Sequence, residues 1–122
     1  MTANADQPLW QPSAERIASA NITAFIALAR TRSGRALEDY AALHAWSIEA
    51  PEDFWCAVWD FGGVVGERGA RVLVDGHRMP GAQWFPDARL NFAQNLLRSR
   101  DDHDALVFWG EDKVHNRMSH GE

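Results

Sequence analysis

The chain has 122 residues, 46% of them hydrophobic and 24% charged, which is ordinary usage for a globular protein able to bury a core. Its net charge of -5 comes with twelve basic residues scattered singly, which argues against a nucleic-acid partner because nucleic acid requires clustered positive charge. Cys56 is the only cysteine, which excludes a disulfide within the chain. The N-terminus lacks signal-peptide features and no window approaches about 20 apolar residues, so we expect a cytoplasmic protein that does not enter membranes.

The first helical region is predicted over residues 13–32. Ser13 can cap a helix whose apolar residues recur at helical spacing. Asn21 can act as a second N-cap, so the pattern allows either one bent helix or two short ones. In both cases the helix should end at Gly34, because glycine readily adopts the left-handed conformation found at helix C-termini.

Two further helices are predicted in the first half of the chain. One covers about residues 36–43, where apolar side chains share one face. The other begins at Pro51, which suits the first helical position, and has two carboxylates in its first turn, where they oppose the positive end of the helix dipole. Its apolar stripe stops at Gly62 and Gly63, which end the helix.

The following segment is predicted to contain a hairpin and a helix. RVLV at 71–74 and HRM at 77–79 flank an Asp-Gly pair, which is typical of a two-residue turn between antiparallel strands. Asp87 can cap a helix that continues to about residue 98 with its apolar residues on one face. The polar run at 99–104 then follows as a linker.

The last part of the chain reads as two short strands followed by the start of a helix. Residues 105–109 are apolar strand formers, and a turn at 110–112 leads to a second strand near 116–118. Ser119 and Glu122 have the spacing of a capping box, which predicts that a helix begins there. A helix start so close to the last residue suggests a piece of a longer protein, although the same spacing also arises by chance.

These elements predict an α+β fold of mainly short α-helices with one or two small β-hairpins. Six tryptophans and six phenylalanines are spread along the chain, and each can anchor a core through a large buried area. We therefore expect four aromatic side chains to be largely buried, namely Phe54, Trp55, Trp59 and Trp84. The alternative is a ligand-stacking surface, but basic residues do not interleave with the aromatics as a nucleotide groove requires.

Three stretches of the chain resemble consecutive N-terminal segments of acetoacetyl-CoA synthetases. They are LWQPSAERIASANITAFIALA at 9–29, YAALHAWSIEAPEDFWCAVWDF at 40–61 and MPGAQWFPDARLNFAQNLLR at 79–98. The final ALVFWGEDKVHNRMSHGE is similar to the point where such enzymes enter their adenylation domain. The resemblance to this subfamily in particular rests on LHAWSIEAPEDFW at 43–55, because related acetyl-CoA synthetases generally lack HAWS.

The resemblance implies that residues 1–104 form the N-terminal accessory domain of an acyl-CoA synthetase and that residues 105–122 begin an adenylation domain. In such ligases acetoacetate and ATP give an acyl-adenylate and pyrophosphate, with magnesium assisting, and CoA then displaces AMP. The implied partner is the missing adenylation domain, and self-association through 105–109 is the alternative for the unpaired strands. Asp87 stands where the family usually has glycine, so either aspartate adopts a backbone angle that favours glycine, or the backbone shifts locally. The implied core or domain-interface residues are Phe54, Trp55, Trp59, Trp84, Phe85, Leu90, Asn91 and Asn95.

No site for this chemistry can be assembled from the residues themselves. GGVVGERG at 62–69 lacks the Lys and Ser or Thr of a phosphate-binding loop and is interpreted as a flexible turn. The five histidines show no metal-ligand spacing, and Cys56 has no basic neighbour to activate it. We therefore expect no catalytic, cofactor-binding or metal-binding residue in this chain. Two functions remain open: a non-catalytic accessory domain of a ligase, or a free-standing helical module that binds another protein through the same aromatic patch.

Overall fold

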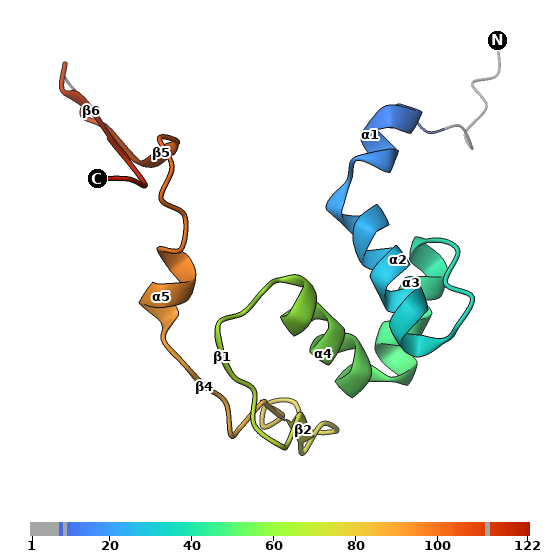
Figure 1. Ribbon diagram of the computed structural model, residues 1–122. Coiled ribbons are helices and arrows are strands. Elements are labelled where there is room, and N and C mark those ends of the chain that lie inside the picture. Colours follow the sequence, from blue (N-terminus) through green and yellow to red (C-terminus); the bar gives the residue numbers. More distant parts are fainter. Residues whose placement is uncertain (1–7, 9, 112) are drawn as a thin grey trace, which may run out of the picture. The chain divides into compact units, whose positions relative to one another are not determined.

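The computed structural model describes residue 8 and residues 10–111 and 113–122. The chain divides into two compact units, Met1–Gly63 and Val64–Glu122, and each is described by itself. Within the described residues, the first unit is helical, and the second combines short antiparallel strands with one short helix (Figure 1). This confirms the predicted α+β class. None of the described helices is long and apolar enough to cross a membrane.

The helical region near the N-terminus consists of two helices, α1 (Ala14–Ala18) and α2 (Asn21–Ser33). The Ser13 side chain accepts a backbone hydrogen bond from the first turn of α1, which confirms it as the N-cap. Of the two alternatives, two separate helices are therefore present. Asn21 is the first residue of α2 and not its N-cap, so that part of the prediction is wrong. Gly34 ends α2 in the left-handed conformation, at φ 66°, as expected.

Helix α3 (Tyr40–Glu49) starts later than the helix predicted at 36–43. Asp39 is in an extended conformation, and its side chain accepts a hydrogen bond of 2.8 Å from the backbone amide of Ala42. The helix therefore begins immediately after this cap and runs further than the apolar pattern indicated. Helix α4 (Pro51–Phe61) has the predicted bounds, with the proline in its first turn.

The core of the helical unit lies where α2, α3 and α4 meet (Figure 1). Trp46 is the largest fully buried side chain, at 2% exposed, and its ring meets Phe54 edge-on with centroids 5.7 Å apart. Leu37 is buried in the connection before α3, and the Arg30 guanidinium donates a 2.7 Å hydrogen bond to its carbonyl. The buried set is Phe25, Ala29, Leu37, Leu43, Trp46 and Ala57.

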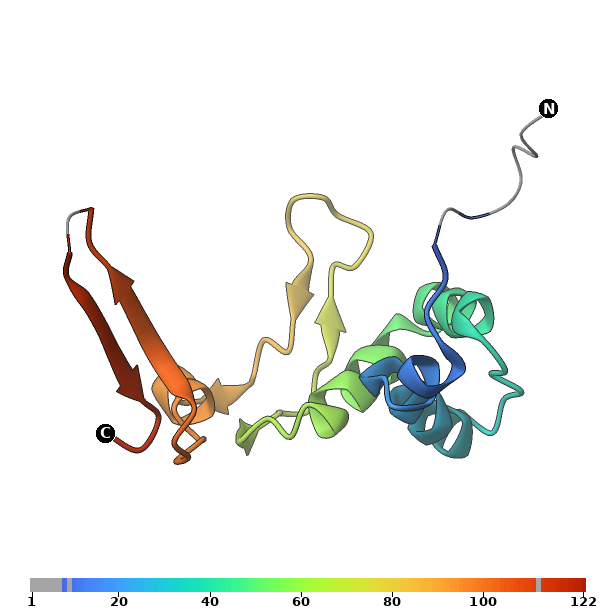
Figure 2. The same ribbon diagram turned by 90° about the horizontal axis from the view of Figure 1, so that it is seen from above.

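The second unit contains two short antiparallel pairs of strands. β1 (Gly66–Glu67) pairs with β4 (Arg89–Leu90), and β2 (Leu73–Val74) pairs with β3 (Gln83–Trp84). Figure 2 shows the long loop that joins β2 to β3. The predicted second hairpin strand at 77–79 is therefore wrong. The Asp-Gly pair does turn the chain, but a proline follows the predicted strand and has no amide to donate to a ladder, so the partner strand comes after it.

Helix α5 (Phe92–Leu96) also begins later than predicted. Its N-cap is Asn91, whose side chain accepts a 3.1 Å hydrogen bond from the backbone amide of Gln94. Asp87 is not a cap; its carboxylate accepts hydrogen bonds of 2.5 and 2.8 Å from the Arg71 guanidinium. Asp87 is also not among the described residues with positive φ, so of the two expectations for it the glycine-favouring angle is wrong.

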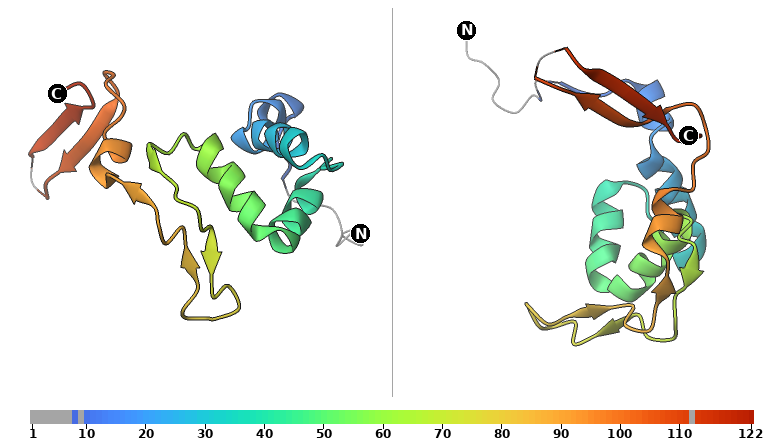
Figure 3. Two further views of the ribbon diagram at one scale, coloured as in Figure 1. Left: turned by 60° about the horizontal axis from the view of Figure 1, so that its bottom comes forward. Right: turned by 90° about the vertical axis from the view of Figure 1, so that its left-hand side faces the viewer.

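The C-terminal hairpin consists of β5 (Asp104–Trp109) and β6 (His115–Ser119), which pair antiparallel as predicted (Figure 3). Asp112, part of the predicted turn, lies outside the described residues. Ser119 donates its backbone amide to the Glu122 carboxylate at 2.8 Å, which is one of the two bonds of a capping box. Residues 120 and 121 form a turn.

Candidate functional site

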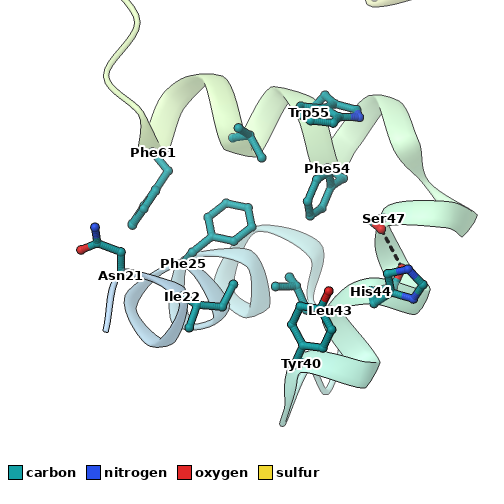
Figure 4. Close-up of a pocket in the computed structure, with 11 residues that line it drawn as sticks. Asn21, Ile22, Phe25, Tyr40, Leu43, His44, Ser47, Phe54, Trp55 and Phe61 are labelled. Atoms are coloured by element: carbon teal, nitrogen blue, oxygen red, sulfur yellow. Dashed lines mark hydrogen bonds between the residues drawn. The ribbon is translucent and has the colours of Figure 1, made fainter. Parts of the chain in front are cut away.

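An apolar groove opens on the helical unit between α2, α3 and α4 (Figure 4). Its volume is about 460 Å³. Phe25 and Leu43 line it with buried side chains, and the rings of Phe25 and Phe54 meet edge-on with centroids 5.7 Å apart. Tyr40 and Trp55, at 66% and 44% exposed, form its open walls. The groove therefore presents aromatic surface to whatever lies outside it.

The polar groups at this groove do not form a catalytic arrangement. The Ser47 hydroxyl donates a 2.7 Å hydrogen bond to the His44 carbonyl, as Figure 4 shows, and is therefore committed to the helix backbone. The His44 ring stacks on Tyr40 with centroids 6.1 Å apart. No carboxylate is among the described residues that line the groove, so no acid–base pair faces it. Its chemistry is that of a hydrophobic contact surface.

The aromatic residues of α4 divide between two faces of the helix. Phe54 and Val58 pack against the core with buried Ala57 between them, at the three- and four-residue spacing of one helix face. Trp55 follows Phe54 by one position, which rotates it about 100° around the helix, and it is 44% exposed. The prediction that Trp55 is largely buried is wrong for this reason. Trp59 is half-buried.

Two of the expected core or interface residues lie on the short strands of the second unit, and a third, Phe85, directly follows β3. Trp84 in β3 is 41% exposed and Leu90 in β4 is 46% exposed, so the prediction of a largely buried Trp84 is also wrong. Each belongs to a pair of two-residue strands, which has no second layer of its own to cover it. Phe85 is half-buried and adopts a positive φ of 46°, which is uncommon for an aromatic residue.

The two asparagines have structural roles within the second unit. The Asn95 side-chain oxygen accepts a 2.8 Å hydrogen bond from the Val65 amide, and its nitrogen donates at 2.9 Å to the Val65 carbonyl. It therefore mimics a neighbouring strand and joins α5 to the segment before β1. The same nitrogen also donates to the carbonyl of Asn91, the N-cap of α5. The contacts with Val65 were not visible in the sequence pattern, because Val65 and Asn95 are 30 residues apart.

The glycine-rich segment at 62–69 is occupied by packing rather than by a ligand. Gly66 lies in β1, where an added Cβ would come within 2.6 Å of the Leu90 Cβ. Gly69 has φ 79°, and an added Cβ would come within 2.5 Å of the Asp87 Cβ. These glycines allow two chain segments to approach closely. The predicted turn is present at residues 62 and 63, and the rest of the segment leads into β1.

The C-terminal hairpin exposes apolar side chains on both faces. Leu106 and Phe108, on one face of β5, are 64% and 59% exposed, and Val107 and Trp109, on the other, are 54% and 75% exposed. Arg117 in the middle of β6 forms an ion pair with Asp104 at the start of β5. The Trp109 ring contacts the His115 ring edge-on, with centroids 4.2 Å apart. The hairpin is therefore apolar on β5 and polar on β6.

The titratable groups of the described residues do not converge on a metal or nucleotide site. No group of three or more His, Cys, Asp and Glu residues within the described part of the chain could hold a metal ion. The Asp101 carboxylate accepts a 3.1 Å hydrogen bond from the His103 backbone amide, which lowers the pKa of that carboxyl. The hydrogen bonds from Arg71 lower the pKa of Asp87 in the same way. Both are local structural contacts.

Comparisons with known proteins relate this chain to a family. Residues 40–96 match the family model for the N-terminus of acetyl-coenzyme A synthetase. An acetoacetyl-coenzyme A synthetase from Rhizobium meliloti (strain 1021) is 48% identical over 97% of this chain, which spans 18% of that enzyme's length. A malonamoyl-CoA synthetase from Penicillium aethiopicum is 37% identical over 75% of this chain, which spans 13% of that protein.

A solved structure agrees with these matches. The acetoacetyl-CoA synthetase from Streptomyces lividans superimposes with a TM-score of 0.80 and 45% identity, covering 93% of this chain and 18% of that one. The fold and the sequence therefore give the same relatives over nearly the same residues. The chain belongs to the acetoacetyl-CoA synthetase family and corresponds to its N-terminal region.

Proposed function

We propose that this chain is a non-catalytic accessory domain of an acetoacetate–CoA ligase. The observation that carries the proposal is its coverage: it aligns with the Rhizobium meliloti enzyme over 97% of its own length and spans 18% of that enzyme. The described residues also lack a metal-binding cluster, and the glycine-rich segment is filled by its own chain. The chemistry would therefore be performed by other parts of the ligase.

The ligase reaction joins acetoacetate to CoA while ATP is converted to AMP and pyrophosphate, with magnesium. We assign none of the described residues a catalytic or cofactor-binding role, and no group of three or more His, Cys, Asp and Glu among them could hold a metal ion. The proposal that acetoacetate is the substrate rests on the names of the similar proteins alone. A malonamoyl-CoA synthetase shares this region at 37% identity, so the region is compatible with more than one acyl group.

The proposed partner is the adenylation domain, with residues 1–104 as the accessory domain and 105–122 as the first adenylation residues. Two-sided apolar strands such as β5 suit the interior of a sheet that is covered on both faces. The partner would also cover the apolar surface of the accessory domain. In the helical unit this would include exposed Trp55 with its neighbours Phe54 and Trp59. In the second unit, taken by itself, it would include exposed Trp84 and Leu90, together with Phe85, Asn91 and Asn95. Lone Cys56 supports a cytoplasmic location.

A second candidate function is a free-standing helical module that binds another protein. The groove between α2, α3 and α4 favours it, because the helical unit closes its own core and still presents an apolar hollow of about 460 Å³. Such a module would bind apolar side chains without any contribution from the C-terminal hairpin. The two functions therefore predict different binding surfaces.

The deciding experiment mixes the purified chain with the remainder of the Rhizobium meliloti enzyme, purified separately without the 18% that aligns with this chain. This remainder is called the complementary region. The chain alone should release no pyrophosphate above background from acetoacetate, ATP, magnesium and CoA. The two pieces together should form a complex whose activity exceeds that of the complementary region alone. Pyrophosphate release by the chain alone would overturn the proposal, and failure to bind the complementary region would favour the free-standing module.

A further inference from the structure

Helix α5 is attached to its own unit through its polar side. The Asn95 side chain bonds to both the amide and the carbonyl of Val65, at 2.8 and 2.9 Å, and donates a further 2.9 Å hydrogen bond to the Asn91 carbonyl. Asn91 and Asn95 are four positions apart and therefore lie on one side of the helix. Among the described elements, α5 makes no extensive contact with another helix or strand. These hydrogen bonds therefore determine which side of α5 is turned toward the segment before β1.

The neighbouring side of α5 is apolar and exposed. Phe92 follows Asn91 by one position and Leu96 follows Asn95 by one, which rotates both about 100° around the helix from the asparagines. Phe92 and Leu96 are 74% and 61% exposed, and Leu97, which ends the helix, is 59% exposed. A helix of a folded domain normally turns its apolar side toward the core. In α5 the polar side is turned toward the chain's own unit instead.

A helix as short as α5 depends on packing for its stability. Isolated helices of fewer than about 12 residues are marginal in water, and most helices in proteins are stabilised by burial of an apolar face. Within its own unit, α5 gains the hydrogen bonds of Asn95 but leaves its large apolar side chains in water. The surface formed by Phe92, Leu96 and Leu97, here called the α5 face, is therefore suited to contact with another protein surface.

The size of the α5 face and the relatives of the chain indicate what covers it. Three side chains are far fewer than the roughly 20 to 30 residues that each partner contributes to a stable interface between separate proteins. A surface in the same polypeptide is already held nearby and needs much less contact area. The Rhizobium meliloti enzyme aligns over 97% of this chain, yet the aligned part is 18% of that enzyme. The rest of such a ligase is therefore the favoured occupant.

We propose that the α5 face docks against the rest of the ligase polypeptide, beyond the region that this chain represents. The inference rests on the proposed function, because it requires the chain to be part of such an enzyme. The surface opposite Phe92 and Leu96 should be apolar, since a polar group there would lose its water without gaining a hydrogen bond. Asn91 and Asn95 would remain bonded within their own unit and would orient α5 for this contact.

The test uses a chimeric enzyme in which this chain replaces the aligned 18% of the Rhizobium meliloti enzyme. Hydroxyl-radical footprinting, measured by mass spectrometry, compares Phe92 and Leu96 in the chimera with the same residues in the 122-residue chain alone. Both side chains should be oxidised several-fold more slowly in the chimera, because docking removes them from water.

Phe92→Glu and Leu96→Glu in the chimera provide a second measurement. Each should shorten the half-life of ligase activity at an inactivating temperature by about tenfold or more, because docking would then bury a charge. Gln94→Glu adds the same charge two positions after Phe92, about 200° around the helix, and is the matched control. It should inactivate at the rate of the parent chimera. The Val65 amide resonance of each variant of the 122-residue chain shows whether the Asn95 contact is retained.

The outcomes separate this inference from the proposed function. A chimera without ligase activity would contradict the accessory-domain function and the docking together. An active chimera whose Phe92 and Leu96 are oxidised as fast as in the chain alone would overturn the docking and leave the accessory-domain function standing. Equal inactivation rates for the Phe92→Glu and Gln94→Glu chimeras would also overturn it, because the added charge would then act regardless of the side of α5 that carries it.

Discussion

The helical unit and the C-terminal hairpin use large apolar residues in opposite ways. Trp46 in α3 is 2% exposed and Phe25 in α2 is 5% exposed, whereas Trp109 and Phe108 in β5 are 75% and 59% exposed. The difference follows from architecture, because three packed helices enclose a core, while a two-stranded ribbon has no second layer. Aromatic content alone therefore does not identify core residues in this chain. The helical unit encloses a core of its own, whereas the hairpin leaves the apolar side chains of β5 available for contact with another strand or domain.

The largest expected effect is at Trp46. Trp46→Ala removes the largest fully buried side chain and its edge contact with Phe54, and should lower the free energy of unfolding by about 3 to 5 kcal/mol. Trp109→Ala is the matched variant in the hairpin and should change the unfolding of the helices by less than about 0.5 kcal/mol. Urea denaturation followed by far-UV circular dichroism measures both. Equal losses in the two variants would contradict the contrast between the units.

A second prediction concerns backbone protection in a dilute, monomeric sample. Amides of 105–118 should exchange with solvent much faster than those of α4, because opening a lone hairpin exposes little additional apolar surface. Hydrogen exchange followed by NMR or mass spectrometry makes the comparison within one sample. Equal protection of both segments would show that the hairpin is stable without a partner.

Helices were predictable where the sequence contains a strong local signal. Pro51 and the Gly62–Gly63 pair fix α4, and Gly34 ends α2, because these residues have intrinsic backbone preferences that tertiary contacts do not need to supply. The start of α3 was missed because Asp39 competes with the apolar pattern that begins three residues earlier. Cap chemistry, rather than hydrophobic periodicity, decides such boundaries.

The second unit was less predictable because its contacts join distant residues. Asp87 accepts hydrogen bonds from Arg71, and Asn95 bonds to the backbone of Val65. Both side chains therefore bond to a segment that is distant in the sequence, which local helix patterns do not reveal. The exposed sides of Trp55 and Trp84 could not be read from composition, since composition does not show which face of an element has a covering layer. The strands of the hairpin were predicted correctly from their local residue preferences.

A third, smaller effect is expected from acid. Hydrogen bonds from Arg71 lower the pKa of Asp87, so this carboxylate stabilises the fold above its unfolded-state pKa of about 4 and loses that contribution as the pH falls through its folded-state pKa. Amide exchange in the β1–β4 and β2–β3 pairs should therefore increase below about pH 4. The effect should be modest, because the Arg71 side chain is 59% exposed. Asp101 titrates in the same direction, so the Asp87→Asn variant is needed to isolate the contribution. Identical pH profiles for parent and variant would contradict this role.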